Sequence, residues 1–146
     1  MIRVDRAIDV DGPADEVFDR LVRIEDLPRW QPAILEATLT SPGPIAVGST
    51  LRIVVGAAGQ HTEATGTVTE FDRPRLIALK ATASSAEITA SVEVAPLTAT
   101  SSRVSIGTTV ALGGTLRFVE GIARSRIEAE APAAAAAAKT WLESSG

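Results

Sequence analysis

The chain has 146 residues with no Cys, one His and a formal net charge of −4 at pH 7, which suits one domain and excludes disulfides, a thiolate nucleophile and a Cys-ligated zinc site. The negative charge and the scattered basic residues disfavour binding to nucleic acid. No apolar run approaches the ~18 residues that cross a bilayer, and the N-terminus lacks the apolar segment of a signal peptide. We therefore expect a single cytoplasmic domain over residues 1–146, with no membrane span.

The first forty residues predict a strand followed by two short helical pieces. Residues 2–10 alternate apolar and polar side chains, which is the period of a half-buried strand. Residues 13–24 repeat apolar side chains at helical spacing after a Pro and several carboxylates, a typical helix start. Pro28 and Pro32 interrupt this helix, so the segment around Trp30 should form a broken helical turn that leads into an extended stretch.

Residues 33–112 predict six strands separated by turns of hairpin length, which favours antiparallel pairing. Apolar side chains alternate with Thr, Ser and charged residues along most of them, so one face of the sheet should be dry and the other wet. The segments are AILEATLT (33–40), STLRIVV (49–55), HTEATGTVTEF (61–71), LIALKATA (76–83), EITASVEV (87–94) and RVSIGTTVAL (103–112).

After Gly113 and Gly114 the apolar period becomes helical and continues for about 30 residues. Pro132 lies inside this helix and predicts a kink near residues 128–132. Because no other element is long enough to cover the dry face of the sheet, the helix should pack on it. The sequence thus predicts an α+β fold in which a curved antiparallel sheet of about seven strands wraps on a long C-terminal helix, with two short helices after the first strand.

Four segments carry a resemblance to a known superfamily: PADEVFDRLVRIEDLPRWQP near the start, VGSTLRI, GTVTEFDRPRLIAL in mid-chain, and LGG before the long final helix. In their order and spacing they resemble the START-like (SRPBCC) superfamily of polyketide cyclase/dehydrase and lipid transport proteins. The resemblance covers nearly the whole chain and implies a helix-grip fold with a mainly apolar small-molecule pocket. It does not select an activity, because the superfamily includes passive carriers, aromatases and cyclases, hormone receptors and chaperone activators.

Strand parity and the apolar stripe of the helix predict which side chains line such a pocket. A shift of one residue would reverse the choice in any strand. Trp30 is expected to pack against the long helix or to contact a ligand. The predicted lining consists of Trp30, Ile53, Val68, Leu79, Ala90, Val92, Val110, Phe118 and Ile122.

No catalytic residue can be identified from the sequence. Cyclases of the superfamily are thought to act through pocket shape and a few Arg, Tyr or His groups, whereas this chain has no Tyr and its one His, His61, is predicted on the wet face. Since only carboxylates remain as ligands, no metal site and no cofactor are predicted. The candidate polar contacts of the pocket are Arg52, Lys80, Arg117 and Glu120.

The leading hypothesis is a protein that binds an apolar small molecule, such as a lipid, a polyketide or an aromatic metabolite, between the sheet and the long helix. One alternative is an enzyme of the polyketide cyclase or dehydratase type, which would need a buried Arg, Glu or His in the pocket. Another is a protein-interaction module similar to chaperone activators, which would have a filled core and an exposed apolar patch. A monomer and a homodimer are both compatible with the sequence.

Overall fold

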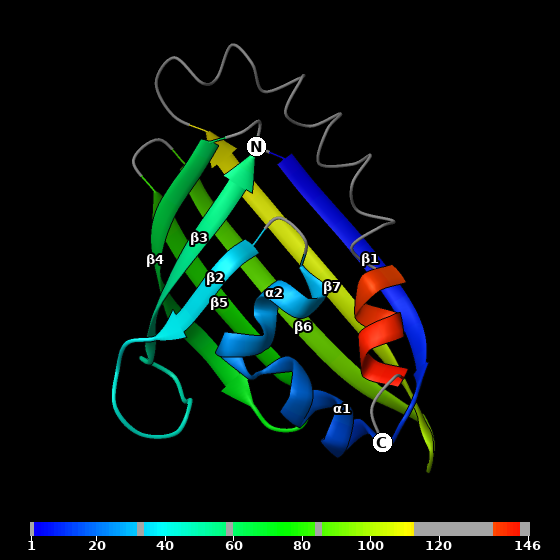
Figure 1. Ribbon diagram of the computed structural model, residues 1–146. Helices are drawn as coiled ribbons and strands as arrows, with labels where there is room; N and C mark the ends of the chain where they lie inside the picture. The colour runs from blue at the N-terminus through cyan, green and yellow to red at the C-terminus, as the bar shows by residue number, and fades with distance from the viewer. Residues whose placement is uncertain (1, 32–33, 58–59, 84–85, 113–135, 144–146) are drawn as a thin grey trace.

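Seven antiparallel strands form one curved sheet in the computed structural model, which describes residues 2–31, 34–57, 60–83, 86–112 and 136–143 (Figure 1). The order across the sheet is β1-β7-β6-β5-β4-β3-β2, so that every chain neighbour from β2 to β7 is also a spatial neighbour. The strands are β1 (Ile2–Asp11), β2 (Ile34–Leu39), β3 (Thr50–Ala57), β4 (Gln60–Asp72), β5 (Leu76–Ala83), β6 (Ala86–Thr98) and β7 (Ser101–Leu112).

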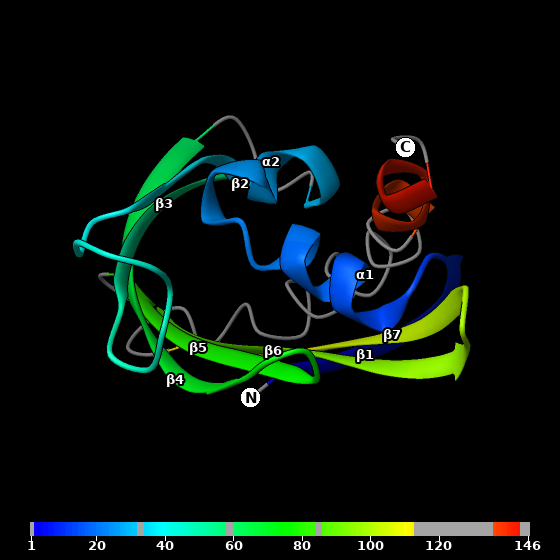
Figure 2. The same cartoon turned by 90° about the horizontal axis from the view of Figure 1, so that it is seen from below.

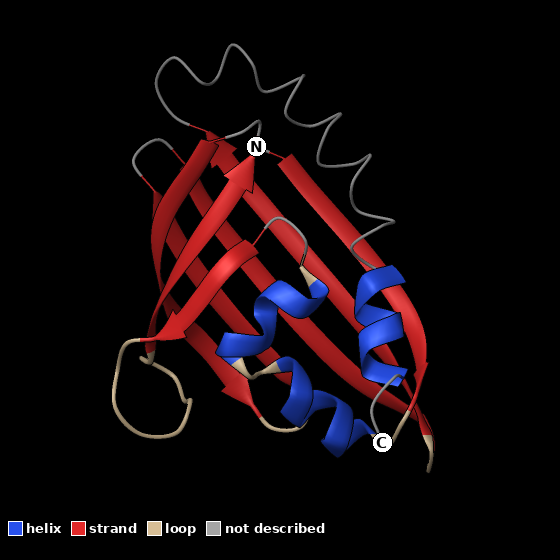
Figure 3. Ribbon diagram, in the orientation of Figure 1, coloured by secondary structure: helices blue, strands red, loops and turns tan. Residues whose placement is uncertain are grey.

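Two short helices and a helical turn connect β1 to β2: α1 (Ala14–Leu21), η1 (Ile24–Asp26) and α2 (Leu27–Trp30). The sheet curves around α1 and α2, and the described C-terminal helical segment, residues 136–143, lies beside β1 (Figure 2). The described helical pieces therefore all lie on the concave side of the sheet (Figure 3). The predicted α+β fold of helix-grip type is confirmed, with seven strands and helices after the first strand.

The register of the strands separates a dry concave face from a wet convex face. One row across β4, β5, β6 and β7 brings together Val68, Leu79, Ala90 and Thr108. In β4, Ala64, Gly66 and Val68 are buried while the residues between them are exposed. The alternation predicted for β4 and β6 is thus the one observed.

The amphipathic helix α1 packs on β6 and β7. Val17, Phe18 and Leu21 are buried because helical spacing places all three on the face turned to the sheet. The Phe18 ring lies 5.8 Å from the Phe71 ring, centroid to centroid, in a tilted arrangement. The helix begins at Ala14 with Pro13 in the N-cap position, one residue later than the sequence predicts.

The predicted broken turn around Trp30 is confirmed. Pro28 lies in the first turn of α2, where a missing N–H group costs no helical hydrogen bond, and Gln31 at the end of the helix is extended. Leu27 and Trp30 are the buried residues of this one-turn helix. The segment therefore carries the indole of Trp30 into the core before the chain enters β2.

The C-terminal segment 136–143 is held to α1 by Arg20. The Arg20 guanidinium donates hydrogen bonds to the carbonyl oxygens of Leu142 (2.8 Å) and Trp141 (3.0 Å). It also lies over the Trp141 ring, 4.4 Å from the centroid, which adds a cation–π contact. The carbonyls at a helix C-terminus have no partner within the helix, so Arg20 satisfies two of them from another element. Residues 113–135 lie outside the described residues, and with them most of the predicted long helix and its kink.

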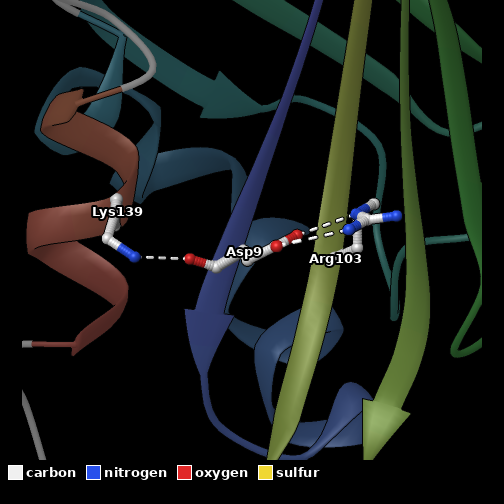
Figure 4. A network of polar contacts seen from close by, with 3 residues as sticks. All are labelled: Asp9, Arg103 and Lys139. Carbon is white, nitrogen blue, oxygen red and sulfur yellow. Dashed lines mark hydrogen bonds and ion pairs between the residues drawn. The ribbon is translucent and has the colours of Figure 1, made fainter.

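The same segment covers part of the edge strand β1 (Figure 4). The Lys139 ammonium donates to the Asp9 carbonyl oxygen, and the Asp11 N–H donates to a Glu143 carboxylate oxygen at 3.2 Å. On the neighbouring strand, Arg103 binds the Asp9 carboxylate. Unpaired edge groups invite pairing with another chain, and these side chains occupy two of them.

On the other side, α1 is tied to the turn between β4 and β5. The Arg73 guanidinium makes two hydrogen bonds to the Asp19 carboxylate, at 2.7 and 2.6 Å. This hydrogen-bonded pairing holds the pKa of Asp19 below its ordinary value, although burial acts in the opposite direction. The helix is therefore fixed at both the sheet and the C-terminal segment.

We expect Arg20→Ala to lower the free energy of unfolding by about 1–3 kcal/mol, because two charge-assisted hydrogen bonds and a ring contact are lost. Urea denaturation measures this change, and hydrogen exchange at residues 136–143 should become faster. Arg23→Ala, an exposed Arg of the same region, is the matched control and should change stability by under about 0.5 kcal/mol. Equal effects of the two substitutions would show that Arg20 does not hold the segment.

We expect the Asp19–Arg73 pair to make stability depend on pH. Because folding lowers the pKa of Asp19, its contribution is present above the unfolded value of about 3.9 and is lost as the pH falls through the folded value. Wild type should exceed Asp19→Asn in unfolding free energy at pH 6, by under about 1 kcal/mol for this half-exposed pair, and the difference should shrink as the pH falls below the unfolded value. A difference that stayed constant over this range would contradict the linkage.

Candidate ligand-binding site

The concave face of the sheet is divided into a buried part and an accessible part. Val94 and Val104 are buried on β6 and β7, the strands on which α1 packs. Further along the same face, Leu79, Ile88 and Ile106 point to the concave side but are only half-buried. Among the described residues, the part of the face beyond α1 is therefore a half-buried apolar surface.

The structure places the predicted lining residues as follows. Trp30 lies in the core cluster, together with Ile53, Val68 and Val92. The described strand residues of the prediction all face the concave side, with Leu79, Ala90 and Val110 half-buried. Phe118 and Ile122 lie outside the described residues. The strand positions thus share one face, and their contact with a ligand stays a prediction. These strand positions are Ile53, Val68, Leu79, Ala90, Val92 and Val110.

The prediction that Arg52 and Lys80 contact the pocket is wrong. Arg52 lies between the inward residues Leu51 and Ile53 and so points to the convex face, where it binds Glu63 at 2.8 Å. This pairing lowers the pKa of Glu63 and raises the pKa of Arg52.

Lys80 follows the inward Leu79 and forms an ion pair with Glu87 at 3.3 Å. Arg52 and Lys80 both point outward because side chains alternate between the two faces of a strand, and each of them is next to an inward residue. The other two candidate polar contacts, Arg117 and Glu120, lie outside the described residues. His61 is exposed, and as the partner of Gly56 in the β3–β4 ladder it lies on the convex face, as predicted.

Two polar residues of the concave face were missed by sequence reasoning. Thr108 is half-buried and pairs with Ala90 and Val4, and Arg6 pairs with Ile106, so both have the inward parity. The signal was present in β1, where Arg6 takes one of the apolar positions of the alternation. A charged residue in that position of a half-buried strand points to the rim of the interior face.

The indole nitrogen of Trp30 is the one unusual polar atom of this interior. The residue is 2% exposed, and its Nε1 has no hydrogen-bond partner in the part of the chain that the structure describes. Two other polar residues are buried in the described part of the chain, Ser49 and Ser102, and both make hydrogen bonds. Ser49 Oγ accepts from the Ala46 N–H, and Ser102 Oγ donates to the Gly12 carbonyl oxygen. Buried Trp N–H groups usually have a partner, so this donor is an exception.

The convex face carries two open depressions, each next to a glycine. One of about 350 Å³ surrounds Gly107, where a Cβ atom would come within 2.9 Å of an Asp5 carboxylate oxygen. The other, of about 430 Å³, lies over Gly66 and is bordered mainly by Thr side chains. The first is also lined by Ser91 and Glu93, and the second by Arg52 and Lys80, so their polar surroundings differ from the apolar concave face.

Comparison with known proteins agrees with this architecture. A model of the family described as polyketide cyclase / dehydrase and lipid transport matches residues 1–143. No curated protein matches the chain. No helix in the described ranges is long and apolar enough to cross a membrane.

Solved structures with the same fold have low sequence identity to the chain. The ZhuI aromatase/cyclase from Streptomyces sp. R1128 is 18% identical with a TM-score of 0.78, over 96% of this chain and 92% of that one. A START superfamily protein from Mycobacterium smegmatis is 17% identical with a TM-score of 0.73, over 95% and 98%. A protein from Thermus thermophilus, TTHA0849, is 11% identical with a TM-score of 0.79, over 96% of each chain. At these identities the likeness shows the fold alone.

We expect the two Trp residues to differ in fluorescence. Trp30 is buried in the core and Trp141 is only half-buried, so Trp141→Phe, which retains Trp30, should emit at shorter wavelength than Trp30→Phe. Acrylamide should quench Trp30 less than Trp141, because a quencher in water cannot reach a buried ring. The reverse order of quenching would contradict the burial of Trp30.

Proposed function

Because the chain belongs to the family of polyketide cyclase / dehydrase and lipid transport proteins, we propose that it binds an apolar small molecule against the concave face of its sheet. Candidate ligands are a lipid, a polyketide or an aromatic metabolite. The family assignment supports a fold that holds a ligand, and the residues of the concave face support its apolar character.

The observation that carries the proposal is the accessible surface of inward-facing apolar side chains. Leu79, Ile88, Ala90, Ile106 and Val110 come from three neighbouring strands and lie on the side of the sheet that normally forms a closed core, yet each is only half-buried. A ligand that covered them would gain about 25 cal/mol for each Å² of apolar surface removed from water. Small side chains such as Ala81 and Ala90 also leave more room than the larger residues common in such faces.

The position of α1 supports a site at one end of this face rather than across all of it. The helix covers β6 and β7 near Val94 and Val104, which are almost fully buried. Ala90 lies four residues from Val94 on the same face of β6 and is half-buried. A ligand would therefore lie beyond α1, over the stretch of β5, β6 and β7 that contains Leu79, Ala90 and Thr108.

We expect Ala90→Trp to abolish the ligand-induced rise in melting temperature, because a large ring at this inward position fills the space that a ligand would occupy. Thr89→Trp is the matched control: its side chain is exposed on the convex face, so the rise should persist. The measurement is a thermal shift with a panel of fatty acids, sterols and polyphenols, preceded by native mass spectrometry of fresh protein for a co-purified mass.

Wild-type protein that carries no co-purified mass and whose melting temperature no member of the panel raises would overturn the proposal. Equal loss of the rise in both variants would place the site off the concave face. Circular dichroism of both variants checks that each remains folded.

A further inference from the structure

From the geometry around Trp30 we infer that the ligand of the concave face bears an oxygen acceptor, such as a carbonyl oxygen, which takes the hydrogen bond of the Trp30 indole N–H. This inference rests on the proposed function and makes it more specific: Trp30 selects between apolar molecules of similar shape according to whether they carry an acceptor. A pure hydrocarbon would fill the same space without meeting this donor.

The first step is the isolation of the donor. Trp30 is 2% exposed and its Nε1 has no partner among the described residues. Leaving a buried donor without an acceptor costs free energy that a partner would recover. The indole N–H is therefore a donor whose hydrogen bond no described residue satisfies.

The second step is the absence of a nearby alternative within the described ranges. Trp30 belongs to a cluster made of apolar side chains, including Leu27, Ala37 and Ile53. The buried hydroxyls of Ser49 and Ser102 bond elsewhere, to the Ala46 N–H and the Gly12 carbonyl. Neither of them accepts a hydrogen bond from the indole.

The third step concerns water. A buried water is usually held by about three hydrogen bonds to polar groups of the protein. The side chains of the cluster around Trp30 are apolar, so apart from the indole itself they supply no hydrogen bond to a water. An oxygen atom that belongs to an apolar ligand needs no further partners, because the rest of the molecule is held by apolar contacts.

The fourth step is the position of α2. It contacts β2, the edge strand on the opposite side of the sheet from β1, and it lies on the concave side (Figure 2). Thr108 on β7 and Arg6 on β1, two polar residues of inward parity, lie toward the other edge. The inward residues of β5 and β6 between α2 and that edge include Leu79, Ala90 and Val92, which are apolar.

The test compares 9-fluorenone with fluorene, two apolar tricyclic molecules that differ by one carbonyl oxygen. Isothermal titration calorimetry measures the dissociation constant of each for wild type and for Trp30→Phe, which keeps an aromatic ring but lacks the N–H. We expect the ratio of the fluorenone constant to the fluorene constant to rise about tenfold in Trp30→Phe. Changes in packing affect both compounds and cancel in the ratio.

Trp141→Phe is the matched control and should leave the ratio unchanged. It also leaves Trp30 as the one Trp in the chain, so a ¹⁵N-labelled sample shows a single indole signal. Fluorenone should move this indole proton further downfield than fluorene does. This measurement keeps the inference falsifiable even if Trp30→Phe does not fold.

The outcomes are distinguishable. If both compounds bind wild type, but the ratio is the same in Trp30→Phe and the indole proton responds equally to both, the inference is wrong and the proposed function stands. If a water cross-peak of the Trp30 indole persists in the fluorenone complex, a water holds the donor and the inference is likewise wrong. If neither compound binds wild type and the ligand panel also fails, the proposed function itself is overturned.

Discussion

The alternation of side chains along seven continuously paired strands is the constraint on which the rest of this structure depends. In antiparallel pairing, each inward residue lies opposite an inward residue of the next strand, so the register determines which face each side chain occupies. Val68, Leu79, Ala90 and Thr108 form such a row across four strands. The register shifts occur between Ile34 and Glu36, Val68 and Glu70, and Pro96 and Thr98. Irregularities of this kind increase twist and bend a sheet, and curvature is what gives the dry face a concave side.

The helix α1 covers one end of the concave face of this curved sheet, over β6 and β7. An isolated helix of eight residues is not stable in water, so its place is set by its partners. Phe18 fills the core, Asp19 binds Arg73 beyond β4, and Arg20 binds the carbonyls at the end of the C-terminal segment. Three consecutive residues thus point to three different elements. The C-terminal segment in turn reaches the edge strand β1 through Lys139. Beyond the end that α1 covers, the inward apolar residues are half-buried among the described residues.

Much of the fold could be predicted from local patterns, because its elements are regular. The alternation in β6 is complete over Ile88, Ala90, Val92 and Val94, and it fixes the face without knowledge of any other strand. The candidate polar residues were predicted less well. Arg52 and Lys80 were chosen for their chemistry against the parity of their own strands, whereas Arg6 was passed over although its parity was inward. Contacts between distant residues left no local pattern at all: Arg20 and Leu142 are separated by 122 positions, and neither side of that contact is a recognisable motif.

For Trp30, the local sequence explains the backbone conformation, and the tertiary structure explains the environment of the side chain. Its local sequence explains why the chain turns there, since Pro28 suits the first turn of α2 and the extended Gln31 ends it. Only the tertiary structure shows that the turn delivers an indole to an apolar interior where its N–H has no described partner. A Phe would contribute most of the same apolar contact without an unpaired donor. The additional N–H is a cost to the fold as described, because a buried donor without a partner is unfavourable. On the inference drawn above, a ligand acceptor would remove this cost, so the difference between Trp and Phe at this position would act on the complex more than on the fold.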